Sequence, residues 1–160
     1  MNRLLDFFDG TGRDGAGRTH ADILALSDEE LQRHHDFVQW LFPNPKPSPV
    51  NPSAPVLTPE AARAIADSPA RKARAIAGFD RMLAFYGFAR DGDGVGPHDG
   101  VRNHWLRPGD HNHLRITRIL TFLGAIGEKK LAEAWLARLE DLPRETVSPA
   151  TRDFWRSAVE

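Results

Sequence analysis

The sequence has 160 residues, enough for one domain with a substantial core, since chains of about 150 residues bury roughly 70% of the surface exposed on unfolding. It carries 21 Lys and Arg against 22 Asp and Glu, so a net charge of -1 excludes whole-molecule attraction to nucleic acid or to an anionic membrane. The absence of cysteine excludes disulfides, thiolate nucleophiles and thiolate zinc sites, and leaves histidine and carboxylate side chains as the strong metal ligands.

No stretch of the chain is apolar over the roughly 20 residues that a helix needs to cross a bilayer. The longest strongly apolar segment, 116–127, is interrupted by Arg118. The N-terminus starts with apolar residues, but Asp6 and Asp9 fall where a signal peptide needs an unbroken apolar region. We therefore expect a soluble, cytoplasmic protein.

The segment 27–43 predicts a long helix. Ser27 and Glu30 have the spacing of a capping box, which predicts that the helix begins at residue 28, and the proline at position 43 ends it. Its inward face follows a 3.6-residue period and consists of Leu31, His35, Val38 and Leu41 or Phe42, widened by Phe37 and Trp40. We therefore expect His35 at the edge of the core.

A proline-rich segment follows at 43–57, and six of the twelve prolines of the chain lie between 43 and 55. This composition predicts a stiff, polyproline-like segment of roughly 3.1 Å per residue, whereas a flexible linker would be rich in glycine and serine. Only about forty residues precede it, near the lower limit for independent folding. We therefore expect an extended arm packed on one domain that spans 1–160, with Asn51 in the middle of the arm forming part of a binding site.

Three further helices are predicted by a hydroxyl N-cap followed by proline, at Thr58-Pro59, Ser68-Pro69 and Ser148-Pro149. The helix that begins at Pro69 is expected to end at Gly87. Apolar residues at helical spacing also indicate helices at 128–142 and 151–159. Since no segment alternates apolar and polar residues with a period of two, we predict an all-α fold of about six to seven helices.

Two glycine-rich segments, 9–18 and 90–100, are expected to be loops. The first contains a G-x-G-x-x-G pattern, but no predicted strand precedes it, which argues against a dinucleotide site. The second begins like a calcium loop, yet Val95 and Arg102 stand where oxygen ligands are required.

The helix predicted at 110–127 carries the leading candidate for a binding surface. One apolar stripe must face the core and consists of Ile116, Ile119, Leu120, Leu123 and Ile126. A second stripe runs along its flank and consists of His111, Arg115, Arg118 and Phe122. The first turn of the helix, with Asn112 and His113, favours an anion. As an alternative, Asp110 caps this turn itself and the arginines pair with acidic side chains elsewhere in the fold.

Enzyme motifs are absent from the sequence, which has no nucleophile elbow, no Walker loop and no evident pair of catalytic carboxylates. His111 and His113 lie about 200° apart on one helix, so they cannot bind the same metal ion unless the first turn unwinds. We expect no metal and no cofactor. Basic and aromatic residues interleave too briefly to indicate a nucleic-acid surface.

Three strings carry a resemblance to a known family: HDFVQWLFP at 35–43, RMLAFYG at 81–87 and HNHLRITRILTFLGAIG at 111–127. In this order they resemble the opioid growth factor receptor domain family, over about residues 7–127. Animal members of the family are described as receptors for an opioid-like growth-regulating peptide and are associated with membranes and nuclei. The positions that match its motifs are His35, Gln39, Trp40, Asn51, His111, Asn112, Arg115 and Arg118. The resemblance implies no catalytic residues.

Three functions are consistent with these observations. The first is a binding module for a peptide or small anionic ligand, on the flank of the 110–127 helix together with Gln39, Trp40 and Asn51. The second is a metal- or phosphate-dependent enzyme that uses His35, His111 or His113 as ligand or general base. The third is an interaction protein in an oligomer, with its four tryptophans partly exposed at an interface.

Overall fold

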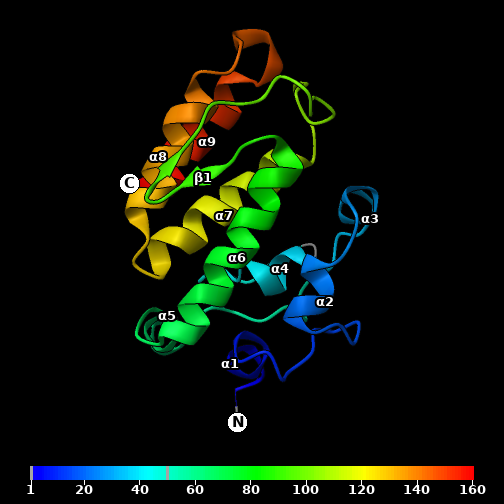
Figure 1. The fold of residues 1–160 in the computed structure, drawn as a ribbon, viewed down its shortest axis with the longest axis vertical. Helices are drawn as coiled ribbons and strands as arrows, with labels where there is room; N and C mark the ends of the chain where they lie inside the picture. The colour runs from blue at the N-terminus through cyan, green and yellow to red at the C-terminus, as the bar shows by residue number, and fades with distance from the viewer. Residues whose placement is uncertain (1, 50) are drawn as a thin grey trace. The chain divides into compact units, whose positions relative to one another are not determined.

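The computed structural model describes residues 2–49 and 51–160, and most of their regular structure is helical. Within this described part there are nine α-helices, one 3-10 helix and one two-stranded hairpin (Figure 1). The all-α prediction is confirmed, although the helices outnumber the six to seven expected. Short helices in the first 42 residues account for the difference.

The chain forms two compact units, Met1–Phe79 and Asp80–Glu160. The boundary falls inside helix α6 (Pro69–Tyr86), which supplies residues to both units. The proline-rich segment 43–57 therefore lies within the first unit and does not separate the two.

The described residues of the first unit form five helices besides the first part of α6: α1 (Arg3–Phe8), α2 (His20–Leu24), α3 (Asp28–Arg33), α4 (Val38–Leu41) and α5 (Pro59–Ala66). The predicted caps are confirmed. Ser27 and Glu30 form the capping box of α3, and the hydroxyls of Thr58 and Ser68 accept backbone N–H groups at the starts of α5 and α6. Each hydroxyl satisfies an N–H group that has no partner within its own helix.

The prediction of one helix from residue 28 to the proline at 43 is wrong. α3 ends at Arg33, His34 adopts an extended conformation, and α4 begins at Val38. The carboxylate of Asp36 in this break accepts a 2.8 Å hydrogen bond from Arg18, a tertiary contact that no local pattern reveals. The predicted inward residues are buried, except that His35 is exposed and does not lie at the core edge.

The proline-rich segment is a closed loop and not an extended arm. The Leu57 N–H donates to the Asn44 carbonyl at 2.9 Å, so the two ends of the segment meet, as in an Ω-loop. Asn51 organises the loop locally: its N–H donates to the Ser48 hydroxyl and its side-chain oxygen accepts the Ser53 hydroxyl at 3.0 Å. Residue 50 of this segment lies outside the described residues.

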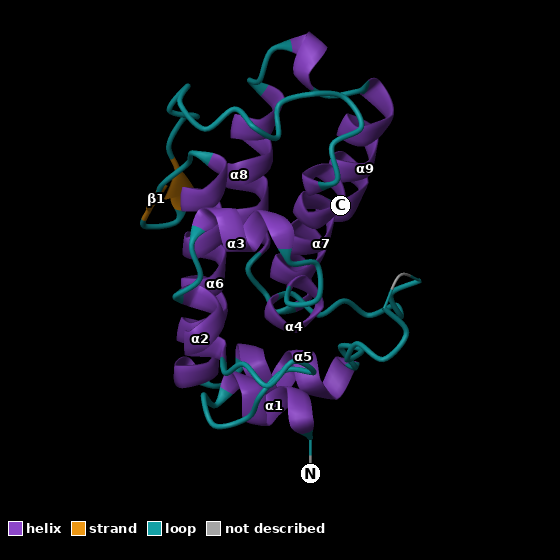
Figure 2. Cartoon of the chain, turned by 90° about the vertical axis from the view of Figure 1, so that its right-hand side faces the viewer, coloured by secondary structure: helices purple, strands orange, loops and turns teal. Residues whose placement is uncertain are grey.

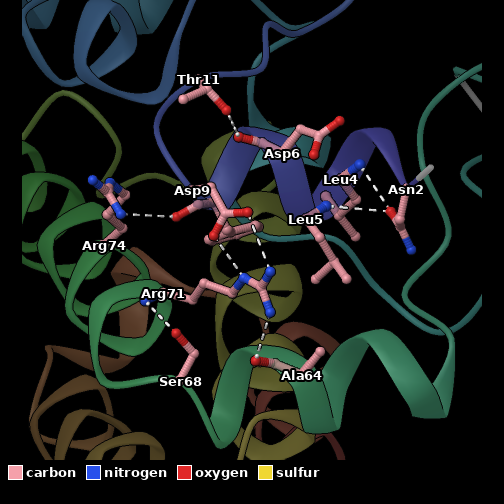
Figure 3. A network of polar contacts seen from close by, with 11 residues as sticks. Asn2, Leu4, Leu5, Asp6, Asp9, Thr11, Ala64, Ser68, Arg71 and Arg74 are labelled. Atoms are coloured by element: carbon pink, nitrogen blue, oxygen red, sulfur yellow. Dashed lines mark hydrogen bonds and ion pairs between the residues drawn. The ribbon is translucent and has the colours of Figure 1, made fainter.

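An ion pair joins the end of α1 to α6 (Figure 3). The Arg71 guanidinium donates to both carboxylate oxygens of Asp9, at 2.8 and 3.2 Å, and also to the Ala64 carbonyl of α5. Arg74, one turn further along α6, donates to the Phe8 carbonyl at 3.2 Å. Two arginines of α6 thus satisfy acceptors at the C-terminal ends of both α1 and α5, where carbonyl groups lack helical partners.

The second unit contains the end of α6, the strands β1 (Arg90–Asp91) and β2 (Gly94–Val95), and the helices α7 (Asn112–Ala125), α8 (Lys129–Glu140) and α9 (Pro149–Val159). A 3-10 turn, Arg144–Thr146, joins α8 to α9. α7, α8 and α9 pack against one another (Figure 2). The whole predicted apolar stripe of α7 is buried, which confirms its assignment to the core.

The expectation of no strand is wrong at one place. Arg90 pairs with Val95 and Asp91 with Gly94 in an antiparallel hairpin, whose two-residue turn contains Gly92 at φ +60°. Gly92-Asp93 is a turn dipeptide of such hairpins, so the sequence held a signal. The Val95 carbonyl accepts a 2.7 Å hydrogen bond from Arg138, which attaches the hairpin to α8.

All four tryptophans are buried, so the expectation that they are partly exposed at an interface is wrong. Trp155 donates its indole N–H to the His113 carbonyl at 3.1 Å, which joins α9 to the start of α7. Its neighbour Phe154, by contrast, is 62% exposed.

Candidate functional site

Asp110 organises the start of α7. One carboxylate oxygen accepts both the backbone N–H and the side-chain amide of Asn112, each at 2.9 Å, and the other accepts Arg107 at 3.1 Å. The side chain is only 1% exposed. The N-cap residue of α7 is His111, which makes no side-chain cap, and the expected acceptor lies one residue earlier: Asp110 caps the N–H group of Asn112, the first residue of the helix.

Asn112 joins this cap to the core. Its side-chain oxygen accepts the Tyr86 hydroxyl at 3.2 Å and the Arg115 guanidinium at 3.4 Å, while its amide donates to Asp110. All four side chains belong to the second unit and are buried. One polar network thus joins the end of α6, the loop before α7 and the first turn of α7.

Burial perturbs the titration of this network. Burial raises the pKa of Tyr86, which keeps the phenol neutral and able to donate. Burial also opposes the charge on Asp110, but the hydrogen bonds from Asn112 and Arg107 outweigh it and hold the pKa of that carboxyl below its usual value. Burial lowers the pKa of Arg115, an effect that the Tyr86 and Asp110 side chains partly offset. The network contains one buried anion and one buried cation.

A second layer supports the network. Trp105 donates to the Tyr86 carbonyl at 3.1 Å, and its own carbonyl lies 2.8 Å from Nε2 of His113. This contact assigns a hydrogen to Nε2, because a carbonyl oxygen can only accept. Nδ1 of the same ring is buried and has no hydrogen-bond partner among the residues described. His113 therefore lies between Trp105 and Trp155 as a packed residue of this unit.

The second stripe of α7 differs in exposure along its length. The His111 side chain is 39% exposed and Arg118 is half-buried, whereas Arg115 and Phe122 are buried. Burial also lowers the pKa of Arg118. His111 and Arg118 are therefore the members of the stripe with solvent access, and Phe122 contributes to the core.

The site residues predicted in the first unit have three different surroundings. His35 is exposed in the break between α3 and α4, and Asn51 is half-buried in the Ω-loop. Trp40 packs its ring 5.5 Å from that of Phe7, with the Arg3 guanidinium over its face. Gln39 is 7% exposed, and its side-chain oxygen has no hydrogen-bond partner within 2–49 and 51–160.

No group of three histidine or carboxylate side chains with the geometry of a metal site occurs among the described residues. None of the helices in that part of the chain is both long and apolar enough to cross a membrane.

Tyr86 and Arg107 take part in the site but were not singled out from the sequence. Tyr86 is buried at the end of α6, and a buried tyrosine needs a partner for its hydroxyl, so its place in a predicted helix was a usable signal. Arg107 had none, because its contact with Asp110 depends on the loop between them.

Comparisons with known proteins agree with the resemblance seen in the sequence. The family model described as the opioid growth factor receptor (OGFr) conserved region matches residues 24–148. The match thus begins later and extends further than the 7–127 expected, and it includes all of α8. No solved structure matches the chain.

Curated relatives of the chain carry the same family name. The opioid growth factor receptors of Rattus norvegicus and Homo sapiens are 38% and 35% identical to it over 102 residues, 61% of this chain. The opioid growth factor receptor-like protein 1 of Xenopus tropicalis is 34% identical over 103 residues. These matches cover 17%, 15% and 20% of the relatives, so the chain spans a fifth or less of their length. Since the family model covers most of the chain and includes the α7 network, the protein belongs to the opioid growth factor receptor conserved-region family.

Proposed function

We propose that this chain is a binding module that recognises the anionic group of a peptide or small ligand on the flank of α7. The observation that carries the proposal is the position of Arg115 and Arg118, two cations on a helix whose apolar stripe is already buried. Burial lowers the pKa of both side chains, so holding them charged costs free energy. An anionic ligand would stabilise both charged forms.

The residues of the flank take different parts in the proposed site. Arg118 and the partly exposed His111 contact the ligand. Arg115 and Asn112 position the first turn of the helix through the network with Asp110, and Phe122 anchors the same flank in the core. Among the residues predicted in the first unit, Gln39 has a buried oxygen without a partner in the described part of the chain, and it is a candidate ligand contact of its own unit.

The family supports the general class of this function. The relatives from Rattus norvegicus and Homo sapiens are named as receptors, and a receptor has a ligand. Because the chain matches a small part of those proteins, we propose only the recognition of an anionic group and not the activity of the whole receptors.

Titration with a short acidic peptide tests the proposal. The probes are an acetylated hexapeptide of Asp and Glu and its uncharged counterpart of Asn and Gln, measured by isothermal titration calorimetry. We expect the acidic peptide alone to bind, and Arg118→Gln to weaken binding about tenfold, since one charge-assisted hydrogen bond contributes roughly 1.5 kcal/mol. Arg63→Gln, at an exposed arginine of α5, is the matched control and should leave the affinity unchanged.

Two outcomes would contradict the proposal. One is an absence of saturable binding by the acidic peptide. The other is a lower melting temperature of Arg115→Gln and Arg118→Gln with unchanged peptide affinity, which would show that the stripe is structural.

A further inference from the structure

An open hollow of about 430 Å³ lies in the second unit, where the end of α8, the 3-10 turn and the first turns of α9 meet. Small-molecule sites in proteins commonly have volumes of roughly 300–1,000 Å³. Leu142 and Val147, both buried, give the hollow an apolar wall, and three arginines and two acidic residues complete most of its lining.

One of these arginines is held in place by the end of a helix. The Arg152 guanidinium donates to the carbonyl oxygens of Leu139, Leu142 and Pro143, at 3.4, 3.1 and 3.0 Å. These carbonyls lie at or just after the end of α8, and those of Leu139 and Pro143 also accept the backbone N–H groups of Leu142 and Thr146, at 3.3 and 3.1 Å. The three carbonyl oxygens hold the Arg152 guanidinium in one orientation, but they carry no formal charge. No carboxylate of the described residues neutralises this arginine.

The other two arginines differ in their pairing. Arg156 donates to the carboxylates of Glu140 and Asp153, so both acidic side chains of the lining are already engaged. Arg144 is exposed at the start of the 3-10 turn, and its side chain makes no hydrogen bond or ion pair within the described part of the chain. The lining thus holds three cations against two anions, and two of the cations lack a carboxylate partner.

We propose that this hollow is a binding site for a small oxyanion ligand, a phosphate monoester or a carboxylate attached to a small apolar group. The guanidinium groups of Arg144 and Arg152 bind the oxyanion, since their fork of donors matches its geometry. Leu142 and Val147 contact the apolar part. The site uses none of the residues of the proposed α7 surface, so each proposal stands or fails independently.

Chemical-shift titration of the full chain tests the inference, with phenyl phosphate, benzoate and the neutral benzyl alcohol as probes at constant ionic strength. We expect saturable shifts of backbone amides within 140–156 for at least one anion, and none of this kind for the alcohol. Binding of phenyl phosphate alone assigns the site to phosphate esters, and binding of benzoate alone assigns it to carboxylates. Shifts confined to 111–118 would instead assign the anion to α7 and overturn the inference.

Variants separate a specific site from general charge attraction. Arg144→Gln should weaken binding about tenfold, because it removes a charge-assisted contact, and the exposed side chain leaves the fold intact. Asp153→Asn should tighten binding several-fold by removing a competing negative charge. Arg33→Gln, at an exposed arginine of α3, should change nothing. The inference is overturned if no anion gives a saturable shift, or if Arg33→Gln weakens binding as much as Arg144→Gln does.

Discussion

At the scale of single residues, the buried histidine of the first unit links stability to pH. His20 is 3% exposed and packs against the rings of Phe7 and Phe8, with centroids 5.3 and 5.7 Å away. Its Nε2 has no hydrogen-bond partner among the residues the structure describes. Burial, assisted by the charge of Arg74, lowers the pKa of His20 to about 4. The folded chain therefore holds this ring neutral.

Acidification should destabilise the protein through this residue. In the unfolded chain His20 titrates near 6.5, so below that pH the unfolded state binds a proton that the folded state excludes. The stabilisation that comes from holding His20 neutral is fully present above pH 6.5 and is lost as the pH falls toward 4. We expect this loss to lower the free energy of unfolding by roughly 3 kcal/mol from pH 7 to pH 4.

Urea unfolding at a series of pH values measures this effect. His20→Leu conserves volume and removes the titrating group, so its stability should fall less steeply between pH 7 and pH 4 than that of the wild type. His35→Leu, at the exposed histidine, is the matched control and should keep the wild-type slope. Equal slopes for wild type and His20→Leu would show that His20 does not control the pH response.

At the scale of elements, the first turn of α7 depends on the buried carboxylate of Asp110. Removal of its acceptor oxygens would leave the backbone N–H and the amide of Asn112 without their partner. The loss of an N-cap costs about 1 kcal/mol, and a buried donor without a partner costs about 1–3 kcal/mol. The cap therefore stabilises the helix and positions the proposed binding surface at the same time.

Substitution of this cap gives a graded test. We expect Asp110→Ala to lower the free energy of unfolding by about 2–3 kcal/mol. Asp110→Asn keeps one acceptor oxygen, so its free energy of unfolding should lie between those of Asp110→Ala and the wild type. Asp141→Ala removes an exposed carboxylate 3.7 Å from Arg138 at the end of α8, and it should cost less than about 0.5 kcal/mol. Chemical denaturation measures all three, and similar losses for Asp110→Ala and Asp141→Ala would refute the structural role of the cap.

At the scale of the whole molecule, α6 is the element that both units share. It is one uninterrupted helix from Pro69 to Tyr86, while the boundary between the units falls after Phe79. Phe79 is buried on one side of that boundary, and Leu83 and Tyr86 are buried on the other. Because neither unit keeps its share of the core without this helix, we predict that the chain unfolds as a single domain over 1–160.

Fluorescence can test this cooperativity, since the first unit contains one tryptophan, Trp40, and the second contains the other three. In Trp40→Phe the emission reports the second unit alone. We expect its denaturation midpoint to coincide with the midpoint from far-ultraviolet circular dichroism of the same variant. Two separated transitions would show that the units unfold independently.

Much of the helical structure could be predicted from the sequence because its determinants are local. The hydroxyl caps and prolines that begin α5, α6 and α9 act within three or four residues of themselves. The role of Asp110 at the start of α7 is local in the same way, because it lies two residues from Asn112, whose N–H group donates to it. The apolar stripe of α7 was correct for the same reason, since a 3.6-residue period is a property of one helix.

Apart from the short hairpin at 90–95, whose turn signal is local, the main errors depend on residues distant in the chain. The break after α3 involves a bond from Arg18 to Asp36, and the closed Ω-loop depends on a bond between residues 44 and 57. At the candidate site, the Tyr86 hydroxyl meets an Asn112 oxygen 26 residues away. Local periodicity contains no information on such pairs, and so it could not separate the buried members of the second stripe of α7 from those with solvent access.

The sequence by itself determined the family, the all-α class and the ends of the longer helices, because motifs, caps and apolar periods are carried by neighbouring residues. Only the tertiary structure decided which members of the α7 stripe are buried, that the proline-rich segment returns on itself, and that arginines gather around a hollow beside α9. Burial and pairing are properties of several segments at once, and they are fixed by packing that no single segment encodes.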